Sequence, residues 1–123
     1  MREHHVGAVV IVDDRADARK PLGLLTDRDI AVELLALGIA PDTLNVYEVV
    51  QRPVTCVDDD AGYAETVHLM SANGVRRMPV TDRGGNLVGI ISLDDVLRQL
   101  AAPLTALGDL VTRERWFEAP TRP

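Results

Sequence analysis

Short apolar runs separated by polar turns recur along the chain and predict β-strands followed by helices. The runs "GAVVIV" and "LGLLT" are joined by the polar loop "DDRADARKP", and the runs "RRMPVT" and "LVGIIS" by the Gly-rich turn "DRGGN". Two such runs with a short turn between them are typical of a β-hairpin. The segments that follow the hairpins, "DRDIAVELLALG" and "LDDVLRQLA", predict helices.

A further strand and helix precede the second hairpin. The stretch "NVYEVV" predicts a short helix or turn, and "VTCV", Val54 to Val57, predicts a strand. Asp58 to Asp60 offer an N-cap and favourable charge for a helix from about Ala61 to Asn73. Gly74 then ends this helix as a left-handed cap. The second half of the chain therefore has the predicted order β-α-β-β-α.

The two halves of the chain are copies of one pattern. At an offset of 69 residues the matched positions are Met1/Met70, Val6/Val75, Ile11/Val80 and Asp13/Asp82. At an offset of 66 they are Gly23/Gly89, Thr26/Ser92 and Asp29/Asp95. The change in offset means that the loop in the first copy is three residues longer than in the second. Internal repeats of this kind indicate two related structural units.

The pattern predicts an α/β (α+β) fold of two β-α-β-β-α repeats and a C-terminal helix. We expect an incomplete first repeat over 1–44, a second repeat over 45–102, and a helix and tail over 103–123, opened by Pro103. The first repeat lacks its initial strand and most of its first helix, so the true start lies upstream or the chain manages without them. Because a missing helix exposes apolar strand surface, we expect a partner chain to cover it, or marginal stability.

Composition narrows the functional classes. The chain is 46% hydrophobic but 3% aromatic, which predicts an aliphatic core. The net charge is −6 and there is one Lys, which argues against a nucleic-acid-binding role. The single Cys56 excludes an internal disulfide and fits a reducing compartment. With no apolar run near the ~20 residues of a membrane span and no signal peptide, we expect a soluble cytoplasmic protein.

The repeated pair Thr26-x-x-Asp29 has two compatible interpretations. A hydroxyl residue followed three positions on by an acid resembles a capping box, which closes a helix N-terminus. The same groups can bind a ligand, because helix N-terminal amides attract phosphate and an ionised carboxylate accepts hydrogen bonds from both hydroxyls of a ribose. One copy alone favours capping.

These blocks together resemble the CBS-domain pair, or Bateman module. The resemblance covers nearly the whole chain through "HVGAVVIVDD…GLLTDRDI" and "GVRRMPVTD…GNLVGIISLDDVL". The chain looks most like small stand-alone bacterial CBS-domain proteins, N-terminally truncated in the first repeat. The resemblance implies pseudo-twofold packing of the repeats, pairing into homodimers, and regulatory binding of adenosine-containing ligands: AMP, ADP, ATP, NAD(H) or S-adenosylmethionine. It implies sensing and signal transduction with no catalysis.

The same resemblance implies the site residues. Thr26 and Asp29 would hold the ribose and phosphate end of the nucleotide. The strand leading into the other repeat would supply the adenine-side wall through Val54, Thr55 and Val57. Ser92 and Asp95 would pair with a strand ahead of Met1. We therefore expect one competent pocket, at Asp29, and one damaged pocket, at Asp95.

The resemblance also implies a phosphate-binding segment, Arg76-Arg77-Met78-Pro79. A solvated arginine pair at a strand start is the alternative interpretation of Arg76 and Arg77. The first copy has Gly7 and Ala8 at the matching positions, so phosphate contacts would come mainly from the second repeat.

Other candidate chemistry is weak. His4, His5 and His68 lack Cys or carboxylate partners at metal-ligand spacing, and Cys56 lies in a β-like apolar stretch, so we expect no metal site, no required cofactor and no catalytic residue. The C-terminal helix predicts either packing on the chain's own domain or a dimer contact, through Leu107, Leu110, Trp116 and Phe117. A regulated protein partner is expected. The rival hypothesis is a structural interaction module whose nucleotide clefts are vestigial.

Overall fold

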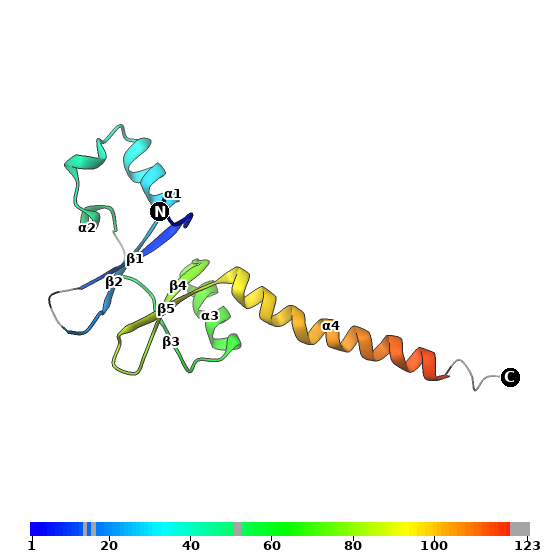
Figure 1. Cartoon of the computed structure of the whole chain (residues 1–123). Helices are drawn as coiled ribbons and strands as arrows, with labels where there is room; N and C mark the ends of the chain where they lie inside the picture. The colour runs from blue at the N-terminus through cyan, green and yellow to red at the C-terminus, as the bar shows by residue number, and fades with distance from the viewer. Residues whose placement is uncertain (14, 16, 51–52, 119–123) are drawn as a thin grey trace. The chain divides into compact units, whose positions relative to one another are not determined.

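The computed structural model describes residues 1–13, 15, 17–50 and 53–118 (Figure 1). The chain divides into two units, Met1–Ile91 and Ser92–Pro123. The first unit carries both hairpins, and the second is built on one long helix. The predicted mixed α+β fold is confirmed.

The first hairpin pairs β1, Ala8–Val12, with β2, Pro21–Thr26, in antiparallel register. Ala8 lies opposite Thr26, and Ile11 lies opposite Gly23. The helix that follows is α1, Asp27–Ile30, which continues as a π-helical stretch, Ala31–Leu35. A 3-10 turn, Pro41–Thr43, and the short helix α2, Val46–Val49, lead toward the second repeat. The expectation of a short helix in "NVYEVV" is thereby confirmed.

The second repeat contains a sheet in the order β3-β4-β5. Its strands are Val57–Asp58, Arg77–Thr81 and Leu87–Ser92, and β3 runs parallel to β4. Between β3 and β4 lies α3, Tyr63–Asn73, which ends at Gly74 with a left-handed φ of 63°. Its N-cap is Gly62, with no side-chain hydrogen bond to the cap, so the prediction of an N-cap at Asp58–Asp60 is wrong. The predicted strand at Val54–Val57 is shorter and later in the structure, where only Val57 and Asp58 pair with β4.

The repeat is visible in the hydrogen bonds as well as in the sequence. Val6 N donates to Met1 O at 3.2 Å, and the matching Val75 N donates to Met70 O at 3.0 Å. His5 has a φ of 51° at the position that matches Gly74, whose φ is 63°. The turn before β1 therefore reproduces the C-terminal end of α3, as the sequence repeat predicts.

The core of the first unit is aliphatic, as composition predicts. Its buried apolar side chains are Leu34, Val49, Val57, Met70 and Met78. Thr66 and Thr81 are also buried, and the Thr66 hydroxyl donates to Gly62 O at 3.0 Å, so its burial leaves the hydroxyl satisfied. The two halves of the unit meet where β2 lies against β4 and where Leu87 N donates to Arg19 O at 2.9 Å.

The second unit corrects one prediction. A single helix, α4, runs from Leu93 to Glu118 with Pro103 inside it, so the prediction that Pro103 opens a new helix is wrong. Proline's fixed φ is compatible with helix, and its missing N–H removes one backbone hydrogen bond. The flanking turns of α4 form in spite of that loss. The predicted domain limits at 44 and 102 stay predictions.

Candidate functional site

Thr26 and Asp29 form a capping box at the start of α1. The amide and the hydroxyl of Thr26 both donate to Asp29 Oδ2 at 2.8 Å, and the Asp29 amide donates to Thr26 Oγ1 at 3.2 Å. Thr26 is the N-cap, in extended conformation, and both side chains are half-buried. The capping interpretation of this motif is therefore confirmed.

Ser92 and Asp95 repeat the same arrangement at the start of α4. The amide and the hydroxyl of Ser92 donate to Asp95 Oδ2 at 2.9 and 2.6 Å, and the Asp95 amide donates to Ser92 Oγ at 3.2 Å. The hydrogen bond from the Ser92 hydroxyl is the main cause that lowers the pKa of Asp95 below its usual value, with the Ser92 amide and the charge of Arg98 adding to it. Asp95 is thus held as a carboxylate.

Capping leaves Oδ1 of Asp29 uncommitted, whereas Oδ1 of Asp95 lies 3.7 Å from Arg98 Nη1 in an ion pair. Among the described residues, each hydrogen bond that the Asp29 carboxylate accepts is made by Oδ2. Within the same residues Oδ1 of Asp29 takes no hydrogen bond. A carboxylate oriented by its own helix cap can therefore present a second acceptor oxygen to a ligand.

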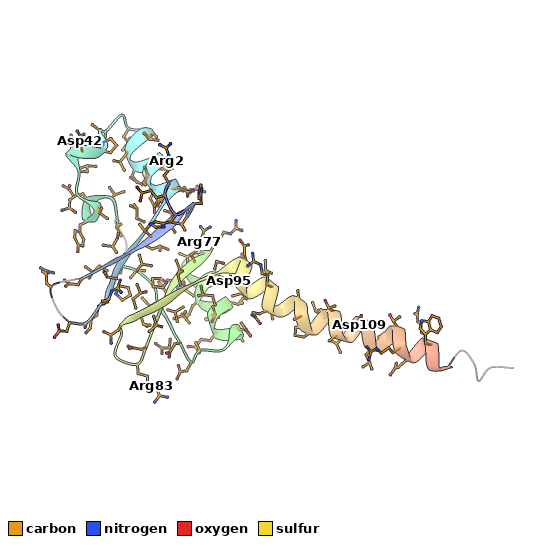
Figure 2. All side chains as sticks on the ribbon, viewed as in Figure 1. Arg2, Asp42, Arg77, Arg83, Asp95 and Asp109 are labelled. Carbon is orange, nitrogen blue, oxygen red and sulfur yellow. The ribbon has the colours of Figure 1, made fainter. Side chains whose placement is uncertain are left out.

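The phosphate-binding candidates separate into exposed and buried residues. Arg76 precedes β4 and Arg77 begins it, and both are exposed (Figure 2 labels Arg77). No ion pair or side-chain hydrogen bond joins either arginine to the residues that the structure describes. Met78 is 0% exposed and Pro79 is fully buried, so in this structure these two side chains belong to the core and anchor the start of β4.

The adenine-wall candidates lie along the approach to β3. Val57 is buried within the strand, while Val54 and Thr55 are half-buried ahead of it. The Thr55 hydroxyl donates to Asn73 Oδ1 at 3.1 Å, which ties this segment to the end of α3. Across the described part of the chain, no hydrogen bond connects these three residues with Thr26 or Asp29.

β2 closely approaches Val50, which precedes the Val54–Val57 segment in the chain. A Cβ built on Gly23 would overlap Cγ1 of Val50, which lies just ahead of the two residues outside the described part of the chain. The matching Gly89 has nothing within 4 Å of such a Cβ. Sequence reasoning aligned the two glycines and did not predict this difference, because only the first sits against another segment.

A second feature that sequence reasoning missed is an open groove at the start of the first repeat. It is lined by Met1, Arg2, His5, Val6, Gly7 and Asp27. Asp27 N donates to Gly7 O at 2.9 Å, and a Cβ on Gly7 would lie 3.0 Å from Asp27 Oδ2. The only sequence signal for this groove was the position of Asp27 beside Thr26.

The remaining candidate chemistry can be described briefly. Burial, followed by the charge of Asp58, raises the pKa of the half-buried Cys56 thiol, which disfavours a reactive thiolate. Over the described ranges, no group of three His, Cys, Asp or Glu side chains is placed to hold a metal ion. No helix in that part of the chain is long and apolar enough to cross a membrane.

Comparison with known sequences identifies the repeats. The family model described as the CBS domain matches residues 1–36 and 46–102. Hypoxic response protein 1 of Mycobacterium tuberculosis is 39% identical over 102 residues, covering 81% of this chain and 67% of that protein. An uncharacterized protein of Methanopyrus kandleri is 37% identical over 98 residues, covering 80% of this chain and 48% of that protein. The chain thus spans about half the length of the Methanopyrus relative.

Comparison with solved structures agrees. The crystal structure of Hypoxic Response Protein I with two coordinated zinc ions gives a TM-score of 0.67 at 37% identity, over 80% of this chain and 76% of that one. The CBS domain pair of protein MJ0100, in complex with 5'-methylthioadenosine and S-adenosyl-L-methionine, gives 0.67 at 26% identity, over 80% and 76%. A hexameric CBS-CP12 protein from bloom-forming cyanobacteria gives 0.67 at 30% identity, over 79% and 54%. The chain belongs to the CBS-domain family.

Proposed function

We propose that this chain is a non-catalytic regulatory module that binds an adenosine-containing nucleotide, with Thr26 and Asp29 holding the ribose. CBS domains are generally regulatory and nucleotide-binding, and the MJ0100 pair holds two adenosine-containing ligands. The observation that carries the proposal is the carboxylate of Asp29, oriented through Oδ2 by its own cap and with Oδ1 available as an acceptor. AMP, ADP, ATP, NAD(H) and S-adenosylmethionine are the candidate ligands.

The arginines of the second repeat supply the phosphate contacts in this proposal. Arg76 and Arg77 are exposed cations at the start of β4, and the buried Met78 and Pro79 hold that strand end in place. The first repeat has Gly7 and Ala8 at the matching positions, so its strand offers no cation. Phosphate binding is therefore asymmetric between the two repeats.

The base lies against the segment from Val54 to Val57 in this proposal. Recognition there is apolar contact plus backbone hydrogen bonding, because Val54 and Val57 carry no polar side-chain atoms. The cleft at Asp29 is the competent one, and the cleft at Ser92 and Asp95 is damaged. We further propose that the module works as a homodimer in the cytoplasm and regulates a protein partner through a ligand-dependent shift between two states.

Calorimetric titration of the full chain with AMP, ATP, NADH and S-adenosylmethionine tests the proposal. Asp29→Ala should abolish binding, and Asp95→Ala is the matched control because it removes the equivalent capping box of the second repeat. Loss of binding in Asp95→Ala alone would contradict the assignment. Arg77→Ala should weaken a phosphorylated ligand about ten- to a hundredfold, since a charge-assisted hydrogen bond contributes about 1.5–3 kcal/mol. Binding of adenosine itself should change less.

A structural interaction module is the second candidate function. Helix capping alone accounts for the hydrogen bonds of Thr26, Asp29, Ser92 and Asp95, so the repeated motif does not require a ligand. This candidate predicts no heat of binding with any of the four nucleotides in a sample that still forms its assembly. Ligand-dependent heat that depends on Asp29 excludes it.

A further inference from the structure

The segment that leads into β3 is tied to the end of α3 by one side chain, Asn73. Pairing of this segment with β4 is found at Val57 and Asp58. Thr55 lies ahead of the paired residues, and its hydroxyl donates to Oδ1 of Asn73 at 3.1 Å. This hydrogen bond therefore joins the segment proposed to contact the base to a helix that is distant from it in the sequence.

Asn73 is held in place by its own helix. It is the last residue of α3, and its side-chain Nδ2 donates to Leu69 O, one turn earlier, at 2.8 Å. The helix then ends at Gly74 in a left-handed conformation, and the buried Met70 anchors its last turn in the core. The Asn73 amide therefore projects from a packed helix toward the irregular segment that contains Thr55.

The hydrogen bond to Leu69 determines which end of the Asn73 amide faces Thr55. A backbone carbonyl can only accept, so the amide nitrogen faces Leu69 O and the amide oxygen faces Thr55. Because the amide oxygen is an acceptor, the Thr55 hydroxyl is the donor of the hydrogen bond between them. The two hydrogen bonds together determine the direction in which the Thr55 proton points.

This direction sets the hydrogen-bonding character of Thr55 toward a ligand. A threonine hydroxyl has a single proton and also accepts through its oxygen. With the proton directed at Asn73, the oxygen is left to accept a hydrogen bond. The 6-amino group of adenine donates, whereas the 6-oxo group of guanine or hypoxanthine accepts. A base with an amino group at this position is therefore favoured, because a 6-oxo group would place one acceptor against another.

The first repeat carries a different side chain at the matching position. At the offset of 69 residues that relates the repeats, Asn73 matches His4, which has no amide. Thr55, Leu69 and Asn73 all lie in the unit Met1–Ile91. None of them lies in α4, whose candidate contact Phe117 has its side chain outside the described residues. The base-selecting hydroxyl therefore belongs to the segment that the proposed function assigns to the cleft at Asp29.

We propose, on the basis of the nucleotide-binding function proposed above, that Asn73 is a positioning residue that determines base specificity. It acts through Thr55, which it fixes as a hydrogen-bond acceptor, so that the site takes a base with a 6-amino group. AMP is the favoured nucleotide, and IMP, which carries a 6-oxo group in its place, is disfavoured. The preference for AMP over IMP should be about two- to tenfold, the range for one hydrogen bond.

Calorimetric titration of the full chain with AMP and with IMP measures this preference as the ratio of two dissociation constants. Asn73→Ala removes the acceptor for the Thr55 proton, so the hydroxyl can turn and donate to a 6-oxo group. The ratio should then fall to near one. Thr55→Val removes the hydroxyl and should lower the ratio in the same way, whereas Thr55→Ser keeps the hydroxyl and should retain the preference for AMP.

Thr66→Val is the control for a purely structural effect on α3. The buried Thr66 hydroxyl donates to Gly62 O at 3.0 Å near the start of the helix, so its removal perturbs the same helix without touching Asn73. This variant should change the free energy of unfolding and leave the ratio at its wild-type value. A ratio that falls in Thr66→Val as it does in Asn73→Ala would contradict the role of Asn73.

The same titrations separate failure of this role from failure of the proposed function. Equal binding of AMP and IMP by wild type, or a ratio unchanged in Asn73→Ala, overturns the role of Asn73 and leaves nucleotide binding standing. Heat with neither AMP nor IMP also overturns the role of Asn73. Titration with ATP, NADH and S-adenosylmethionine then decides whether the proposed function fails with it.

Discussion

Substitution of Gly23 by alanine tests how closely β2 approaches the segment that leads into the second repeat. Gly23 is buried at the third position of β2, and an added Cβ would overlap Cγ1 of Val50 and lie 3.3 Å from its Cβ. Rotation of the valine side chain cannot relieve the overlap, because its Cβ, which does not move on rotation about χ1, is itself close to the added methyl group. Overpacking of this kind costs about 1–3 kcal/mol.

The matched control is Gly89→Ala at the equivalent position of β5. A Cβ there meets nothing within 4 Å. Replacing a strand glycine by alanine without strain stabilises a fold by roughly 0.5–1 kcal/mol, because the unfolded chain loses freedom. Urea unfolding monitored by circular dichroism should therefore show Gly23→Ala less stable than Gly89→Ala by about 1.5 kcal/mol or more.

A double-mutant cycle identifies the contact responsible. Val50→Ala should recover part of the loss caused by Gly23→Ala, with a coupling of about 1 kcal/mol or more, because the two side chains would compete for one space. Equal stability of the two glycine variants, or additive effects in the cycle, would refute the close approach of β2 to Val50.

Two further predictions follow from the turns. His5→Gly should raise the free energy of unfolding by up to about 1 kcal/mol, because His5 has a left-handed φ of 51°. Gly74→Ala should lower the free energy of unfolding by a similar amount. Chemical denaturation measures both variants, and a His5→Gly variant less stable than wild type would contradict the left-handed conformation of His5. Hydrogen bonds from Asn86 and from Gly84 hold the pKa of Asp82 below its ordinary 3.8. Because the pKa of Asp82 is lower in the folded state than in the unfolded state, its carboxylate stabilises the fold at pH values above the unfolded-state pKa. This stabilisation is lost as the pH falls through the folded-state pKa, so wild type should lose stability below about pH 4. Asp82→Asn, which keeps an acceptor for the turn amides, should weaken that pH dependence in the same measurement, and an unchanged acid profile would contradict it.

The hairpins and the capping boxes could be predicted from the sequence because each depends on residues close together in the chain. Apolar runs with a turn between them define a hairpin, and a hydroxyl residue three positions before an aspartate defines a cap. The left-handed end of α3 followed from Gly74 for the same reason. The structure shows the same left-handed turn at His5, the position that matches Gly74, although a histidine alone gives no such signal.

The remaining features depend on contacts between distant segments. The overlap of Gly23 with Val50 requires knowing that β2 meets the approach to the second repeat. The burial of Met78 follows from the packing of β4 and not from its neighbours in sequence. Pro103 was expected to begin a helix because proline favours a first turn. Leucines continue at helical spacing on both sides of it, and helix formation over 26 residues outweighs one lost hydrogen bond.

The measurement that tests the account most directly is calorimetric titration of wild type, Asp29→Ala and Asp95→Ala with ATP and S-adenosylmethionine. The account predicts heat of binding with at least one of these ligands for wild type and Asp95→Ala, and none for Asp29→Ala, with all three proteins folded by circular dichroism. Binding that survives Asp29→Ala, or that is lost only in Asp95→Ala, would contradict it.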